Sequence, residues 1–152
     1  ESCLRQAEIT APLQHPHLQR FYGVCHVGEP FIVVERCEQI SGNVSWKILL
    51  ECALGLVYLH ERRAVYQRTT ASELSLLTSR GKGLLSTTNL LRIPENTSDQ
   101  SAILNDVYQF GLAVFLTLAR ARRPTENTLV RALPTVQPEF ASEKEWSLLC
   151  GM

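Results

Sequence analysis

The stretch from Arg62 to Pro94 contains six basic residues and only one carboxylate, Glu73. Carboxylates are the side chains that accept a proton from an alcohol and that hold Mg²⁺ on a nucleotide. Glu73 without an aspartate partner makes a weak Mg²⁺ site, because such sites rely on carboxylates together with phosphates. The simpler interpretation is a solvated loop glutamate that pairs with Arg68 or Arg80.

Histidines and cysteines provide no stronger candidate site. The five cysteines include no C-x-x-C pair, which favours buried thiols in a reducing compartment over disulfides or a zinc site. The four histidines have no metal-ligand spacing on a helix. Cys25 and His26 are adjacent but would point apart on a strand, so they do not form a nucleophile with its base.

The composition indicates one folded domain, since 45% of the 152 residues are hydrophobic and 20% are charged. Fifteen basic residues balance fifteen acidic ones, and no aromatic platform accompanies the basic stretch, so no nucleic-acid partner is expected. The longest apolar run, 111–119, is too short to span a bilayer, and no signal peptide opens the chain. We therefore expect a cytoplasmic protein without a membrane partner. A start without Met suggests an excerpt of a longer protein.

The N-terminal third predicts a helix followed by a hairpin. Residues 2–14 suit an amphipathic helix, weakened in its last turn by Pro12. Its expected inner face carries Leu4, Ala7, Ala11 and Leu13. Segments 18–25 and 31–37 are rich in β-forming residues and are joined by a turn at 26–30, which is typical of a β-hairpin.

The rest of the chain predicts three helices and some short strands. A turn and cap at 41–43 precede a long buried helix that ends near Arg62 and carries Trp46, Leu49, Leu50, Ala53, Leu54, Val57 and Tyr58 at helical spacing. Residues 74–77 and 83–85 flank a turn at Arg80-Gly81, and 107–119 is long and apolar enough for a core helix. A last helix spans 143–150, with Ser142 and Glu145 spaced as a capping box. Both tryptophans, at 46 and 146, are expected to anchor the core.

Five segments in this order resemble a protein kinase domain, in the style of tyrosine kinases and tyrosine-kinase-like kinases. They are LRQAEITAPLQHPHLQRFYGVC, FIVVERC, WKILLECALGLVYLHERRAVYQR, LNDVYQFGLAVFLTLARARRP and EWSLLCGM. They are similar to the αC helix with its following strand, the next strand and hinge, the αE helix with the catalytic loop, αF and αH. The resemblance implies an α+β fold, mainly α. Residues 1–40 would form a partial N-lobe (αC helix plus hairpin) and 41–152 a kinase-like C-lobe, in one continuous domain.

The same resemblance implies that the phosphotransfer residues are missing. The H-R-D-L-x-x-x-N motif corresponds to a segment in which Arg68 stands for the catalytic base and Glu73 for the metal-binding Asn. Arg68 accepts no proton at any ordinary pH. The D-F-G motif corresponds to Thr87-Thr88-Asn89, and a hydroxyl is a poor substitute for a carboxylate on a hard cation. The αC glutamate corresponds to Gln6, and the phosphate-binding lysine would precede Glu1.

Scaffold positions of the family are kept in part. Asp106 corresponds to the αF aspartate that accepts hydrogen bonds from backbone N–H groups of the catalytic loop; the simpler alternative is an ordinary helix N-terminal aspartate. The hinge would be Glu35, Arg36 and Cys37, and Glu95 would end the A-P-E motif. The column of side chains that links the lobes would be Thr10, Phe21, Tyr66 and Thr88, and two threonines in it suggest a broken column.

These correspondences predict a pseudokinase, an inactive protein-interaction or regulatory module in signalling that binds a protein partner, such as another kinase. ATP and Mg²⁺, the cofactors of the family, are not expected to bind. Two alternatives stay open. The chain could be a fragment of a protein kinase whose missing N-lobe lies outside it, with ATP-dependent transfer to Ser, Thr or Tyr. It could also be a truncated gene product without function.

Overall fold

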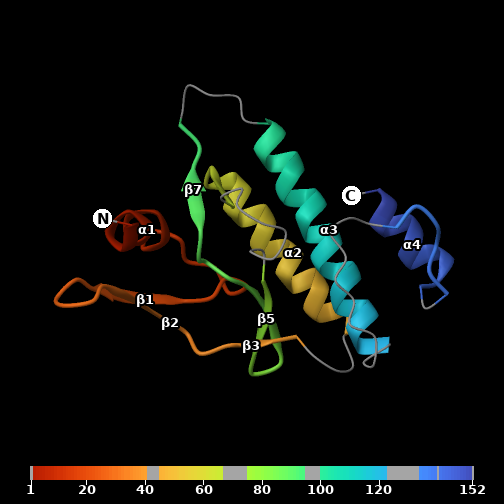
Figure 1. The fold of residues 1–152 in the computed structure, drawn as a ribbon, viewed down its shortest axis with the longest axis horizontal. Coiled ribbons are helices and arrows are strands. Elements are labelled where there is room, and N and C mark those ends of the chain that lie inside the picture. Colours follow the sequence, from red (N-terminus) through yellow and green to blue (C-terminus); the bar gives the residue numbers. More distant parts are fainter. Residues whose placement is uncertain are drawn as a thin grey trace.

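The structure, a computed structural model, describes residues 2–40, 45–66, 75–94, 100–122, 134–139 and 141–151. Within these ranges the fold is mixed α+β, with helices as its larger part (Figure 1). The helices are α1 (Ser2–Thr10), α2 (Trp46–Glu61), α3 (Gln100–Arg122) and α4 (Glu143–Cys150). The strands are β1 (Phe21–Cys25), β2 (Phe31–Val34), β3 (Glu38–Gln39), β4 (Ala64–Tyr66), β5 (Leu76–Ser79), β6 (Lys82–Leu85) and β7 (Leu90–Arg92).

The described strands form three small antiparallel sheets. β1 pairs with β2, β5 lies between β3 and β6, and β4 pairs with β7. The expected hairpin at 18–37 is confirmed in a shorter form. The turn at Arg80-Gly81 is also confirmed, and both of its residues adopt positive φ, 51° and 75°. That turn suits β5 and β6 because two left-handed residues match the twist of a two-residue hairpin. Figure 1 places the β1–β2 hairpin with α1 at one end of the molecule and α4 at the other.

Helix α1 is shorter than expected and turns a different face inward. It ends at Thr10, and a turn follows at 11–12, since proline restricts the residue before it and cannot donate within a helix. The expected apolar face was wrong: Leu4 is 47% exposed. Ile9 packs on the core, and Thr10 is buried. A polar residue was therefore hidden on the inner face, where the apolar pattern could not reveal it.

Helix α2 has the predicted length, but its exposed face is apolar. Ser45 caps it by accepting a hydrogen bond from the Lys47 backbone N–H at 3.3 Å; the expected cap at 41–43 lies outside the described residues. The inner face is Leu49, Cys52, Gly55, Leu56 and Leu59. The prediction of a buried helix was wrong for Leu50, Leu54 and Val57, which are exposed by 61%, 46% and 54%. Trp46 is 40% exposed and does not anchor the core as expected, whereas Trp146 packs against it.

Glycines let α2 approach its neighbours closely. A Cβ placed on Gly83 of β6 would lie 2.1 Å from the backbone oxygen of Ile48, and one on Gly55 would lie 2.5 Å from that of His17. Both distances are far inside van der Waals contact, so neither position accepts a side chain without movement of the backbone. The Gly83 N–H also donates to Glu51 Oε2 at 2.7 Å, which fixes β6 against α2.

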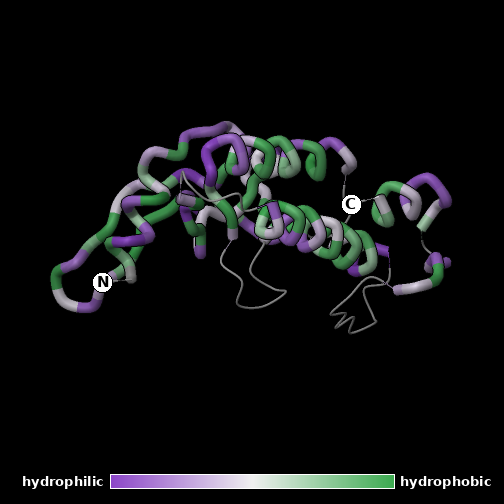
Figure 2. Tube along the Cα trace, turned by 90° about the horizontal axis from the view of Figure 1, so that it is seen from above, coloured by the Kyte–Doolittle hydropathy of each residue, from purple (hydrophilic) through white to green (hydrophobic). Residues whose placement is uncertain are grey.

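Helix α3 is the central apolar element and is longer than the expected 107–119. Phe110, Val114, Phe115 and Leu118 lie in the main core cluster, which is shared with α2. Of the described segments, this helix alone is long and apolar enough to cross a membrane by length and composition, and 44% of its most apolar window is buried inside the fold. Figure 2 shows hydrophobic residues recurring along the helices. The contacts of α3 with the core account for the buried part of this window.

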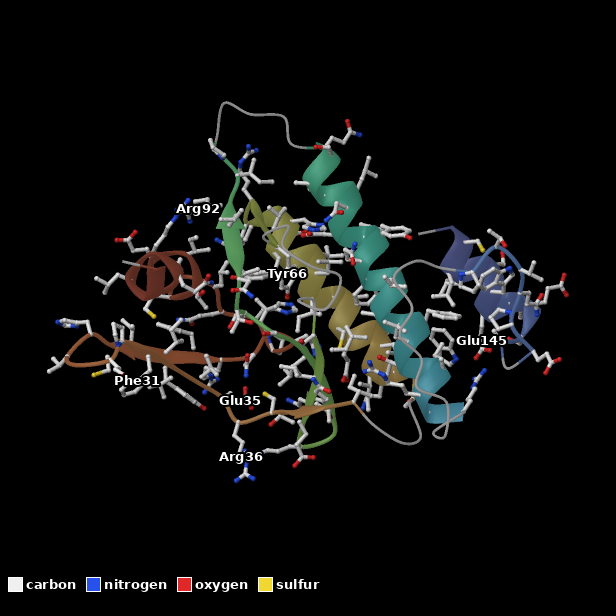
Figure 3. The ribbon with its side chains drawn as sticks, viewed as in Figure 1. Phe31, Glu35, Arg36, Tyr66, Arg92 and Glu145 are labelled. Atoms are coloured by element: carbon white, nitrogen blue, oxygen red, sulfur yellow. The ribbon has the colours of Figure 1, made fainter. Side chains whose placement is uncertain are left out.

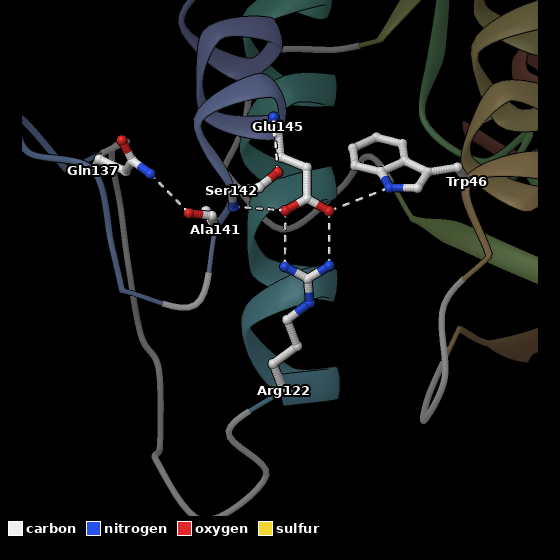
Figure 4. A network of polar contacts seen from close by, with 6 residues as sticks. All are labelled: Trp46, Arg122, Gln137, Ala141, Ser142 and Glu145. Carbon is white, nitrogen blue, oxygen red and sulfur yellow. Dashed lines mark hydrogen bonds and ion pairs between the residues drawn. The ribbon is translucent and has the colours of Figure 1, made fainter.

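One ion pair ties the last helix to the end of α3 (Figure 4). The Arg122 guanidinium donates to both oxygens of Glu145, at 2.7 and 2.9 Å, which is the strong two-pronged geometry. The predicted capping box at Ser142 and Glu145 is confirmed. Trp46 Nε1 donates to the same carboxylate at 3.3 Å, so Glu145 joins α2, α3 and α4. The hydrogen bonds from Arg122 lower the pKa of Glu145 to about 2.

Candidate functional site

A buried polar cluster joins α1 to the segment between β6 and β7. The side-chain amide of Gln6 donates to Thr10 Oγ1 at 3.0 Å and to the backbone oxygen of Thr87 at 3.1 Å. The hydroxyl of Thr10 also points to the Thr87 oxygen, at 3.4 Å. Every group in these contacts is neutral. The α1 helix is therefore held against this segment by hydrogen bonds that need no metal, phosphate or lysine.

The side chain of Thr87 is used inside the fold. Its hydroxyl donates to the backbone oxygen of Gln19 at 3.2 Å, and the residue is 2% exposed. Gln19 in turn donates its side-chain amide to the backbone oxygen of Glu35 at 2.9 Å. Thr88 is exposed, and its hydroxyl lies 2.8 Å from Ser86 Oγ. The Thr88 hydroxyl thus makes a local contact, and the buried Thr87 hydroxyl donates its proton to the segment before β1.

Asp106 is a buried carboxylate near this polar cluster. It is 1% exposed, and its Oδ2 accepts a hydrogen bond from the Tyr66 backbone N–H at 3.2 Å. His60 Nε2 lies 3.1 Å from the same oxygen. The resemblance implies that Asp106 accepts hydrogen bonds from backbone N–H groups of the loop that begins at Tyr66. In the structure the carboxylate accepts such a bond from the Tyr66 N–H. Buried carboxylates are stable only with such partners.

Tyr66 connects this carboxylate to the polar cluster. Its phenol donates to the backbone oxygen of Ser86, next to Thr87. Burial, followed by the negative charge of Asp106, raises the pKa of the Tyr66 phenol, so it stays protonated and acts as a donor. Figure 3 places Tyr66 in the interior. A continuous set of hydrogen bonds therefore runs from α3 through β4 to the segment that holds α1.

The four positions of the expected column differ in burial. Thr10 and Tyr66 are buried, Phe21 is half-buried, and Thr88 is exposed. The buried threonine of the 87–88 pair is Thr87, one residue earlier than the position expected in the column. Thr88 begins the turn at 88–89 that leads into β7, and its side chain is exposed there.

The three hinge positions differ from one another. Glu35 is engaged: its Oε1 accepts from Ser79 Oγ at 3.0 Å, and its N–H donates to the Arg20 oxygen at 2.7 Å. Arg36 is exposed and lies at the periphery in Figure 3. Burial raises the pKa of the Cys37 thiol, which makes it a poor nucleophile at neutral pH.

Some predicted site residues cannot be placed. Arg68, Glu73 and Glu95 lie outside the described residues. In the ranges that the structure describes, no group of three or more His, Cys, Asp or Glu side chains is arranged to hold a metal ion. The sequence interpretation missed Gln19 and Ser86, which lie 68 and 20 residues from their partners Thr87 and Tyr66. No local pattern could have revealed contacts over such separations.

The comparisons with known proteins give one partial relationship. No protein-family model matches this chain. An alignment of 91 residues is 33% identical to "Spermatocyte protein spe-8" of Caenorhabditis elegans, covering 51% of this chain and 18% of that protein. The protein of the same name from Caenorhabditis briggsae is 31% identical over 91 residues, covering 51% of this chain and 17% of the relative. The chain thus spans less than a fifth of the length of the curated relatives that it matches.

Proposed function

We propose that this chain is a kinase-like domain without phosphoryl-transfer activity, a pseudokinase, and that it acts by binding another protein. The order of the elements supports the proposal: a helix, a hairpin, a short connection and a long helix match the expected order of a partial N-lobe followed by a C-lobe. The bond between Asp106 and the Tyr66 N–H supports it as well, since this is the contact that the resemblance implies for a C-lobe.

One observation carries the inactive part of the proposal. The position that the resemblance assigns to the metal-binding aspartate is Thr87, whose hydroxyl is buried and donates to the Gln19 oxygen. A neutral oxygen that already donates its proton within the fold is a poor ligand for Mg²⁺, which prefers carboxylate and phosphate oxygens. Gln6, at the position of the αC glutamate, donates to the Thr87 backbone instead of pairing with a lysine.

The same contacts favour a binding role. In the arrangement found here, α1 is fixed by neutral hydrogen bonds and not by a nucleotide-dependent ion pair. Its position should therefore be the same with and without nucleotide. Such a domain presents a constant surface, which suits a cytoplasmic adaptor or regulatory subunit for a protein partner, and another kinase is one candidate. The relatives are named spermatocyte proteins, so spermatocytes are the first cells in which to look for that partner.

The test is radioactive phosphotransfer by the full-length natural protein that contains this chain. The proposal expects incorporation at the level of a blank without protein. Incorporation above that level that survives Arg68→Ala and Glu73→Ala would contradict it. The fragment alternative has a separate readout, the midpoint of thermal unfolding. A ligand at a hundredfold its Kd stabilises a protein by about 2.7 kcal/mol, so an increase that requires both ATP and Mg²⁺ would favour an active site completed by a neighbouring segment.

A further inference from the structure

Helix α2 carries an apolar stripe on its solvent side. The stripe consists of Trp46, Leu50, Leu54 and Val57, all between 40% and 61% exposed. Spacings of four, four and three residues place them along one side of a helix. The opposite side carries the residues that α2 buries in the core. Helix α2 is therefore apolar on two faces. One packs in the core, and the other stays 40–61% exposed, although Trp46 at its start donates to Glu145 of α4.

Charged residues lie at both ends of this stripe. Lys47 lies at its start, and Glu61 lies at its end, followed by Arg62, whose guanidinium is turned over the Tyr58 ring at 5.3 Å from its centroid. Lys47 lies in the first turn, with its side chain 75% exposed, and Glu61 is the last helical residue and is exposed. They are 14 residues apart, or about 21 Å along the helix axis at 1.5 Å per residue. Leu54 lies midway between them. Lys47 also approaches Glu51 at 3.8 Å, a weak pair within the same helix.

We propose that the α2 stripe is a self-association surface, through which two copies of this chain pair with their α2 helices antiparallel. A two-fold axis through Leu54 places Lys47 of each copy opposite Glu61 of the other, so both charged ends become complementary. The same axis places Leu50 beside the Val57 region of the second copy. A parallel pairing would instead put Lys47 against Lys47 and Glu61 against Glu61.

The area of the stripe limits the affinity of the dimer. Specific interfaces commonly bury about 800 Å² on each partner, and four side chains on one helix cover only part of such an area. The dimer should therefore be weak, form at micromolar or higher concentration, and exchange rapidly with monomer. The charged ends should contribute to orientation more than to affinity. This inference concerns α2 alone and does not depend on whether the domain is a pseudokinase.

The first measurement is sedimentation equilibrium of the chain from low to high micromolar concentration. The proposal expects a monomer–dimer equilibrium for the wild type and monomer throughout for Leu54→Glu. Phe31→Ser and Val33→Ser are matched controls, since both residues are exposed and apolar but lie on the β2 strand. They should leave the dimer unchanged. A wild type that is monomeric throughout, or a dimer lost in the β2 variants and retained in Leu54→Glu, would overturn the proposal.

Charge exchange tests the antiparallel geometry. Lys47→Glu and Glu61→Lys should each weaken self-association about tenfold, because each variant places like charges at both ends of the pair. An equimolar mixture of the two variants should recover the wild-type association, since every end then pairs opposite charges. Lys144→Glu, an exposed charge reversal on α4, is the control and should change nothing. Circular dichroism checks that each variant is folded. A mixture no more associated than its components would refute the antiparallel pair.

Discussion

The side-chain amide of Gln6 lies 3.1 Å from the backbone oxygen of Thr87, and this contact joins two positions 81 residues apart. According to the resemblance, the first position corresponds to a glutamate that orients a lysine, and the second corresponds to an aspartate that holds a metal ion. Here they meet through a neutral hydrogen bond. This contact therefore needs no charged side chain, because amide and hydroxyl groups satisfy the backbone oxygen of Thr87.

Thr87 provides the first prediction. Replacing Thr87 with Asp should lower the free energy of unfolding by about 3 kcal/mol, because a buried carboxylate loses water and cannot donate to the Gln19 oxygen. Thr87→Val should cost about 1 kcal/mol, the value of one neutral hydrogen bond. Urea unfolding measures both. Thr135→Val, at an exposed position, is the control and should change stability little. Equal stabilities of Thr87→Asp and the wild type would contradict the buried hydrogen bond.

Asp106 provides the second prediction. Asp106→Ala should lower the free energy of unfolding by about 3 kcal/mol, since it removes the acceptor for the Tyr66 N–H and the partner of His60. Asp106→Asn should lose less, because an amide oxygen can still accept from Tyr66. Chemical denaturation provides both values. The control is Glu8→Ala, an exposed carboxylate on α1, with a change within about 0.5 kcal/mol. A loss of that small size for Asp106→Ala would show that the buried carboxylate does not organise this region.

The pair of Arg122 and Glu145 predicts a dependence of stability on pH. The folded pKa of Glu145 is about 2, against an ordinary value of 4.5. A lowered carboxylate pKa stabilises the fold above the unfolded value, and this contribution is lost as the pH falls from about 4.5 to 2. The full shift would equal about 3 kcal/mol, but solvent screening of Arg122, whose side chain is 38% exposed, reduces it to roughly 1–2 kcal/mol.

The measurement is the difference in unfolding free energy between the wild type and Glu145→Gln, since this difference cancels the titration of other groups. We expect it to be constant from pH 7 to about 5 and to shrink below pH 4.5. Glu143→Gln, an exposed acidic residue of the same first turn, should give a much smaller difference. A Glu145→Gln difference that stays constant down to pH 2 would contradict the ion pair.

Gly83 provides a prediction about packing. Gly83→Ala places a methyl group 2.1 Å from the Ile48 backbone oxygen, so β6 must move away from α2 at a cost of about 2 kcal/mol or more. Gly23→Ala is the control, because a Cβ there meets nothing within 4 Å. Thermal unfolding of both variants compares them directly. A stability of Gly83→Ala like that of Gly23→Ala would mean that α2 and β6 do not approach so closely.

The sequence predicts the elements of this fold better than their faces. The hairpin at 21–34, the turn at Arg80-Gly81 and the capping box at Ser142 each follow from short-range chemistry, which a local pattern records. The inner face of α1 could not be predicted, since it carries Gln6 and Thr10, whose partner Thr87 is far along the chain. The buried residues of α2 could not be predicted for a related reason. The helix has two apolar faces, and tertiary packing decides which of them is buried.

The residues of the candidate site also differ in whether the sequence could predict them. Asp106 could be singled out from its segment, because LNDVYQFG is distinctive, and Tyr66 could be named from its place after the long helix. Gln19 and Ser86 could not, since each meets its partner Thr87 or Tyr66 through a backbone oxygen, which any residue type supplies. Side-chain identity has no bearing on such contacts, so the sequence holds no signal for them.

Phosphotransfer by the full-length natural protein, compared side by side with its Asp106→Ala variant, tests the central claim most directly. The account predicts equal incorporation of labelled phosphate in the two samples, at the level of a blank without protein. Incorporation by the wild type that disappears in Asp106→Ala would belong to this domain and would contradict the claim that it transfers no phosphate.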